Sequence, residues 1–87
     1  MTIEEYRNLI AEKYKTCEYS VKGFSKGTKV KFLWQWVDEP TLLTGCIEVI
    51  DIDGGGICAN ITPSFDIRVG ESTYKHVSIV DVVEIVL

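Results

Sequence analysis

The fold of this chain is decided by one run, Lys29-Val-Lys-Phe-Leu-Trp-Gln-Trp36, in which polar and apolar residues alternate. Four further runs with similar alternation follow it, at residues 43–51, 65–69, 74–77 and 82–87. A period of two is typical of antiparallel strands that bury one face and expose the other. Proline, glycine and polar residues between the runs favour turns. The pattern therefore predicts a mainly β chain of five short strands, folded as a small barrel or sandwich.

The residues before the strands predict an amphipathic helix that begins after Thr2 and ends near Thr16. Thr2 and Glu5 form the T-x-x-E pattern of a capping box. Apolar residues at helical spacing form one stripe that should pack on the strands: Ile3, Tyr6, Leu9, Ile10, Tyr14 and Cys17. Near the other end of the chain, Ser78 should cap a short 3₁₀ turn that leads into the last strand.

Length and composition indicate one small globular domain. The chain has 87 residues, of which 46% are hydrophobic and 25% charged, so it supports a single thin core. No apolar run is long enough to span a membrane and the first residues do not resemble a secretory signal, so we expect a cytoplasmic protein. Three cysteines without metal-ligand spacing, Cys17, Cys46 and Cys58, should be reduced.

The sequence carries no pattern typical of an enzyme. The stretch Asp51-Ile-Asp53-Gly54 resembles the start of a calcium loop, but Thr62 stands where the loop needs a glutamate. A hairpin turn at residues 53–56 explains the glycines better. His76, the one histidine, lies in a strand run and is interpreted as structural. We therefore expect no catalytic residues, no metal and no cofactor.

Charge is unevenly distributed along the chain, whose net charge is −4. Residues 13–31 hold six lysines and one glutamate, whereas residues 38–87 hold nine acids and two basic residues. The lysine-rich stretch also contains aromatic residues, a combination that nucleic-acid-binding surfaces use. Seven acids of the second stretch could occupy a site meant for phosphates on a partner protein: Glu48, Asp51, Asp53, Asp66, Glu71, Asp81 and Glu84.

The first strand run has an unusually aromatic face. Alternation places Val30, Phe32, Trp34 and Trp36 on one face, and Lys29, Lys31, Leu33 and Gln35 on the other. A thin core does not easily bury Phe32 and both tryptophans, since each large ring fills much of it. We therefore expect at least one of Trp34 and Trp36 to be partly exposed beside the following turn, where a tryptophan is a typical binding anchor.

The order of these runs resembles SH3-like barrels of the Tudor and KOW type. The resemblance is carried by Gly27-Thr-Lys-Val-Lys-Phe32, Gly45-Cys-Ile-Glu-Val-Ile-Asp51, Phe65-Asp-Ile-Arg-Val69, Tyr74-Lys-His-Val77 and Ile79-Val-Asp-Val-Val-Glu-Ile85. The last three are also similar to small proteins of phages and prophages. The resemblance covers about residues 24–87 and implies a five-stranded SH3-like antiparallel barrel at residues 23–87. The N-terminal helix and connector, residues 1–22, would pack on it within a single domain.

The resulting hypothesis is a non-catalytic module that binds a protein. The phage resemblance implies that it modulates or inhibits a host protein, in the host cytoplasm, as an anti-defence or anti-CRISPR inhibitor of a nucleic-acid-binding target would. The predicted binding residues are Trp34, Trp36, Asp38, Glu39, Asp51, Asp53, Asp66 and Tyr74. The alternative is a nucleic-acid-binding domain that uses Lys22, Lys26, Lys29 and Lys31. Either form would be a monomer or a weak homodimer, without a membrane partner.

Overall fold

The computed structural model describes residues 2–16, 21–35, 38–52 and 63–86. Within them the elements, in chain order, are α1 (Ile3–Thr16), β1 (Lys29–Trp34), β2 (Thr41–Asp51), β3 (Ser64–Val69), β4 (Ser72–Ser78), η1 (Ile79–Asp81) and β5 (Val82–Ile85). The predicted mainly β chain with one N-terminal helix is confirmed. The predicted turn at residues 53–56 lies outside the described residues.

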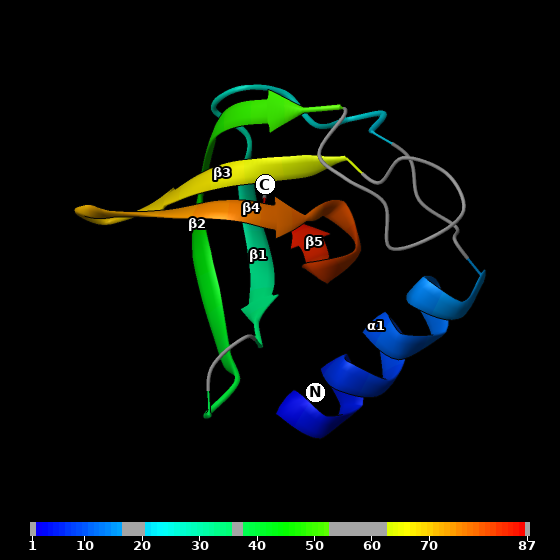
Figure 1. Cartoon of the computed structure of the whole chain (residues 1–87). Coiled ribbons are helices and arrows are strands. Elements are labelled where there is room, and N and C mark those ends of the chain that lie inside the picture. Colours follow the sequence, from blue (N-terminus) through cyan, green and yellow to red (C-terminus); the bar gives the residue numbers. More distant parts are fainter. Residues whose placement is uncertain (1, 17–20, 36–37, 53–62, 87) are drawn as a thin grey trace.

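The five strands form one antiparallel sheet in the order β4-β3-β2-β1-β5 (Figure 1). Each strand pairs with its sequence neighbour, except that β5 returns to pair with β1. Among the described residues no ladder joins the two edge strands, β4 and β5. The sheet is therefore open in its hydrogen bonding, and the closed barrel that the sequence predicts is not confirmed.

The long strand β2 bends where it changes partners. Its first half pairs with β1 and its second half pairs with β3, and Figure 1 shows the strand curving between the two. Gly45 lies at this point. A Cβ atom there would collide with the backbone carbonyl of Arg68 and would lie 2.8 Å from Cγ2 of Val69. The close approach of β3 to β2 therefore requires a residue without a side chain.

The core lies mainly on the inner face of this curved sheet. Its buried members come from every element: Ile10, Val30, Phe32, Leu33, Ile47, Phe65, Ile67, Val77, Ile79, Val80 and Val82. Phe24, in the connector before β1, packs its ring 5.2 Å from the ring of Phe65. The connector thus contributes one half-buried aromatic side chain that packs against the core.

The helix begins at the predicted capping box. The Thr2 backbone N–H donates to Glu5 Oε1 at 3.1 Å, and the Glu5 N–H donates to Thr2 Oγ1 at 3.2 Å. Both bonds satisfy amides that the first helical turn leaves without partners.

The apolar stripe of the helix is narrower than the sequence predicts. Ile10 is buried and Ile3 is half-buried, but Leu9 is 42% exposed, so its place in the stripe was predicted wrongly. Lys13 is half-buried instead, and its Nζ donates to the carbonyl oxygen of Val82 at 3.3 Å. The reason is that α1 packs on η1 and the start of β5, a narrow edge of the sheet (Figure 1).

Leu33 differs from the prediction in burial. Its pairing with Leu42 continues the regular register between β1 and β2, so Leu33 lies on the same face of β1 as Lys31. Leu33 is nevertheless fully buried. On that same face Gln35 donates from Nε2 to Asp81 Oδ1 of η1 at 2.9 Å, and η1 is the element on which α1 packs. Alternation predicts which face a residue occupies, but here a second layer covers the outer face too.

The 3₁₀ turn is confirmed with its predicted cap. Ser78 Oγ accepts a hydrogen bond from the N–H of Val80 at 3.2 Å, at the N-terminus of η1. This cap turns the chain sharply between β4 and β5.

We predict that Gly45→Ala destabilises the fold by about 3 kcal/mol or prevents folding, because the added methyl meets backbone atoms that cannot move without breaking the β2–β3 ladder. Thr44→Ala, at the exposed neighbouring position, is the control and should cost less than about 1 kcal/mol. Urea unfolding of both variants measures the difference. Equal losses would show that β2 does not need glycine at its bend.

We also predict a pH-dependent contribution from the capping box. The pKa of Glu5 lies below its ordinary value of 4.5, chiefly because the Thr2 backbone N–H donates to its carboxylate. A lowered pKa stabilises the fold above the unfolded-state value, and this stabilisation is lost as the pH falls through the folded-state value. Wild type should therefore exceed Glu5→Gln in Tm at pH 7, and the gap should close below pH 4.5. A gap that is constant from pH 7 to pH 3 would exclude a role for the charge.

Candidate binding surface

Two partly exposed aromatic residues meet where the end of β1 approaches β4. The ring of Trp34 lies 5.0 Å from that of Tyr74 at an interplanar angle of 74°, and Phe32 lies 5.8 Å from Tyr74 at 65°. Both are edge-to-face arrangements, which the ring quadrupoles favour. Phe32 is fully buried, whereas Trp34 and Tyr74 are half-buried. We call the exposed parts of the latter two the Trp34–Tyr74 surface.

Two exposed acids lie close to this surface along the chain. Asp38 and Glu39 belong to the turn between β1 and β2, which ends where Thr41 pairs with Trp34. Thr41 Oγ1 donates to the carbonyl of Glu39 at 3.0 Å and fixes the turn at its second strand. Trp34, Tyr74, Asp38 and Glu39 are the predicted binding residues that occupy this end of the sheet.

Other predicted binding residues lie elsewhere. Asp51 is exposed at the far end of β2, opposite Ser64 of β3. Asp66 is half-buried in β3, where its Oδ1 accepts a hydrogen bond from the backbone N–H of His76 at 3.2 Å. Trp36 and Asp53 lie outside the described residues.

Several acids of the C-terminal stretch do not offer a free charge. Asp81 is only 1% exposed and accepts the hydrogen bond from Gln35, so its place among the surface acids was predicted wrongly. Two others, Glu48 and Glu84, are in ion pairs, whereas Glu71 is exposed. Glu48 Oε1 lies 3.1 Å from Arg68, and Glu84 Oε1 lies 3.0 Å from Lys31. The hydrogen bond to Glu84 also raises the pKa of Lys31 above its ordinary value.

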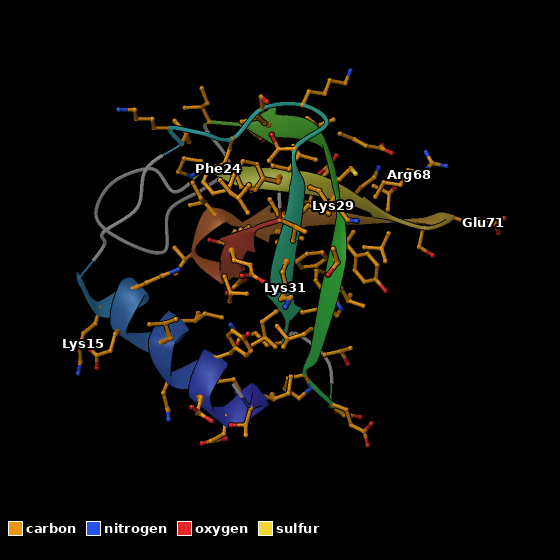
Figure 2. The ribbon with its side chains drawn as sticks, turned by 180° about the vertical axis from the view of Figure 1, so that it is seen from behind. Lys15, Phe24, Lys29, Lys31, Arg68 and Glu71 are labelled. Carbon is orange, nitrogen blue, oxygen red and sulfur yellow. The ribbon has the colours of Figure 1, made fainter. Side chains whose placement is uncertain are left out.

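The lysine-rich stretch is dispersed by the fold. Figure 2 shows Lys15 on α1, pointing away from Lys29 and Lys31 on β1. Lys15 lies 3.7 Å from Glu12, and Lys13 donates to the backbone of β5. Of the predicted nucleic-acid residues, Lys22, Lys26 and Lys29 are exposed, and Lys31 is in the ion pair with Glu84. The six lysines therefore do not form one continuous basic face.

The described part of the chain contains no group of three or more His, Cys, Asp or Glu side chains that could hold a metal ion. Cys46 has an exposed free thiol on the outer face of the sheet, in register with Lys29 of β1 and Arg68 of β3. The other two cysteines lie outside the described residues. No helix in the described ranges is both long and apolar enough to cross a membrane.

Comparison of the chain with protein-family models, with curated proteins and with solved structures found no match. Function is therefore inferred from the residues and geometry described above.

Sequence reasoning missed two polar contacts that shape the surface, Gln35 with Asp81 and Asp66 with His76. The second had a signal in the sequence. Tyr74 and Val77 are three residues apart, so a regular strand would place them on opposite faces, although both are apolar enough for the core. The first depends on a contact between residues 46 positions apart, which no local pattern reveals.

We predict that Gln35→Ala destabilises the protein by about 1–2 kcal/mol, because the buried carboxylate of Asp81 then loses the hydrogen bond from the Gln35 amide. Thr41→Ala, which removes an exposed hydrogen bond from the same hairpin, should cost less than about 1 kcal/mol. Chemical denaturation measures both values. If the two variants are equally stable, Gln35 is not a significant partner of Asp81.

Proposed function

We propose that this protein is a non-catalytic protein-binding module that docks its partner on the Trp34–Tyr74 surface. The observation that supports this most is the half-buried edge-to-face pair, which leaves part of two large rings in contact with water. Tryptophan and tyrosine are the residue types that most often dominate binding energy at interfaces, because they bury much area at little entropic cost.

The partner in this proposal presents a basic surface. Asp38 and Glu39 are exposed beside the aromatic pair, and the chain carries a net charge of −4. Acids at the rim of an interface speed the encounter with a basic partner and disfavour acidic ones. A protein that normally binds nucleic acid has such a surface, which agrees with the host-protein inhibitor that the phage resemblance implies.

The finer fold in this proposal is an SH3-like barrel. Three observations support it: the strand order, the bend in β2, and the 3₁₀ turn that carries the chain from β4 directly into β5. A curved sheet with this order brings its first and last strands near each other. The aromatic pair would then lie at the mouth of the barrel.

Nucleic-acid binding is the less favoured function. Phosphate recognition needs clustered cations, and the lysines at 13, 15 and 31 contact other groups of this chain. Lys22, Lys26 and Lys29 are the remaining exposed candidates.

The test is affinity capture from a lysate of the host, followed by measurement of the dissociation constant with the captured protein. Trp34→Leu, which keeps an apolar side chain in the core, should weaken binding about 30-fold if the indole is an anchor. The double variant Asp38→Asn with Glu39→Gln keeps side-chain shape and should reduce the salt dependence of association. Glu71→Gln, in the β3–β4 turn, is the charge control and should bind as wild type.

Labelled RNA and single-stranded DNA provide the competing arm of this test. Salt-sensitive mobility shifts that disappear in Lys26→Glu with Lys29→Glu would favour the nucleic-acid function instead. A captured partner that Trp34→Leu binds as tightly as wild type would refute the proposed docking surface.

A further inference from the structure

The placement of Tyr74 depends on an irregularity in β4. Phe65 pairs with Val77, and Ile67 pairs with Tyr74. Between these pairs β3 advances by two residues while β4 advances by three, so Lys75 and His76 together oppose Asp66. This is a β-bulge. It puts Tyr74 and Val77 on the same inner face, whereas an unbroken ladder would put one of them on the outside.

The bulge has an unfavourable backbone conformation at its centre. His76 has a φ of +58°, the left-handed region that residues with a Cβ atom rarely adopt. Among the described residues it is the only one other than glycine with a positive φ. Such a conformation persists only where surrounding contacts stabilise it.

Asp66 supplies such a contact. Its Oδ1 accepts the backbone N–H of His76 at 3.2 Å, at the place where the irregular pairing interrupts the ladder. The carboxylate is half-buried in β3, directly across from the bulge. It therefore satisfies a main-chain donor in the conformation that the bulge requires.

We infer that Asp66 is a positioning residue of the Trp34–Tyr74 surface: its side chain holds the β4 bulge, and the bulge places the Tyr74 ring against Trp34. This inference gives Asp66 a different role from the direct partner contact that the sequence predicts. Its importance for binding rests on the proposed function, but its effect on Tyr74 does not.

Three substitutions of Asp66 separate the two roles. Asp66→Asn removes the charge but keeps an acceptor oxygen at the same distance from the backbone. Asp66→Glu keeps the charge but moves the carboxylate by one methylene group. Asp66→Ala removes both. If Asp66 positions Tyr74, the Asp66→Asn variant should preserve the Trp34–Tyr74 surface, and the Asp66→Ala and Asp66→Glu variants should impair it. If Asp66 instead contacts the partner through its charge, Asp66→Glu should preserve binding and Asp66→Asn should lose it.

The primary readout is nuclear magnetic resonance of the free protein. Wild type and Asp66→Asn should show Overhauser contacts between the rings of Tyr74 and Trp34, together with a strong Overhauser contact between the amide proton and Hα of His76 that reports the positive φ. Asp66→Ala should lose both signals. Adding His76→Gly to Asp66→Ala should restore the ring contacts, because glycine adopts positive φ without a supporting hydrogen bond.

Several results would overturn the inference. These are ring contacts that persist in Asp66→Ala, a loss in Asp66→Asn equal to that in Asp66→Ala, or a failure of His76→Gly to restore the contacts. If Asp66→Ala does not fold, the comparison of Asn with Glu decides the question in the same way.

A second arm keeps the inference distinct from the proposed function. With the partner captured as described above, affinities should follow the ring contacts across the Asp66 variants. If ring contacts respond as inferred while Trp34→Leu leaves partner affinity unchanged, the docking surface is wrong and the role of Asp66 in placing Tyr74 stands.

Discussion

The structure depends on one constraint: a single small sheet has to curve enough to enclose a core. A regular strand places residues three apart on opposite faces, yet three strands here place such residues on the inner face together. Judged by register with buried partners, the pairs are Ile47 with Ile50, Tyr74 with Val77, and Val82 with Ile85, of which Ile85 is 37% exposed. A shift of register lies between the members of each pair. Bulges increase local twist and bend a strand. Together with the close approach of β3 at Gly45, they curve the sheet around Phe32 and Phe65.

The sequence predicted what local chemistry determines and missed what long-range contacts determine. The capping box at Thr2 and the cap at Ser78 are interactions within a few residues, so their patterns were sufficient. The period of two located all five strands to within a few residues. It did not predict that Leu33 is buried, since burial depends on elements far along the chain, such as η1, which contacts both β1 and α1. Closure of the sheet into a barrel likewise depends on contacts between residues far apart in the sequence.

The candidate surface was predictable to a similar extent. The first strand run carries more large aromatic side chains than a thin core can bury, so at least one of them has to reach the surface. This predicted Trp34 and the acids of the following turn as binding residues. Tyr74 was named among the binding residues without a reason to pair it with Trp34, and the observed ring distance between the two depends on the β4 bulge. Acidic residues were the weakest guide. Charge counted along the chain could not distinguish the buried Asp81 or the paired Glu84 from the exposed Asp38.

The edges of the sheet indicate how a partner would dock. An open sheet presents unpaired main-chain groups that can pair with another strand, and proteins commonly block them with charges, bulges or covering elements. On β5, Lys13 of the helix already donates to the carbonyl of Val82. On β4, the bulge at His76 and the exposed Lys75 interrupt the edge. Main-chain pairing is therefore disfavoured at both edges. Recognition in the proposed function would then rely on side-chain contact, and among the described residues Trp34 and Tyr74 are large aromatic side chains of the inner face that are only half-buried. The same bulge thus disfavours strand addition and supports the aromatic surface.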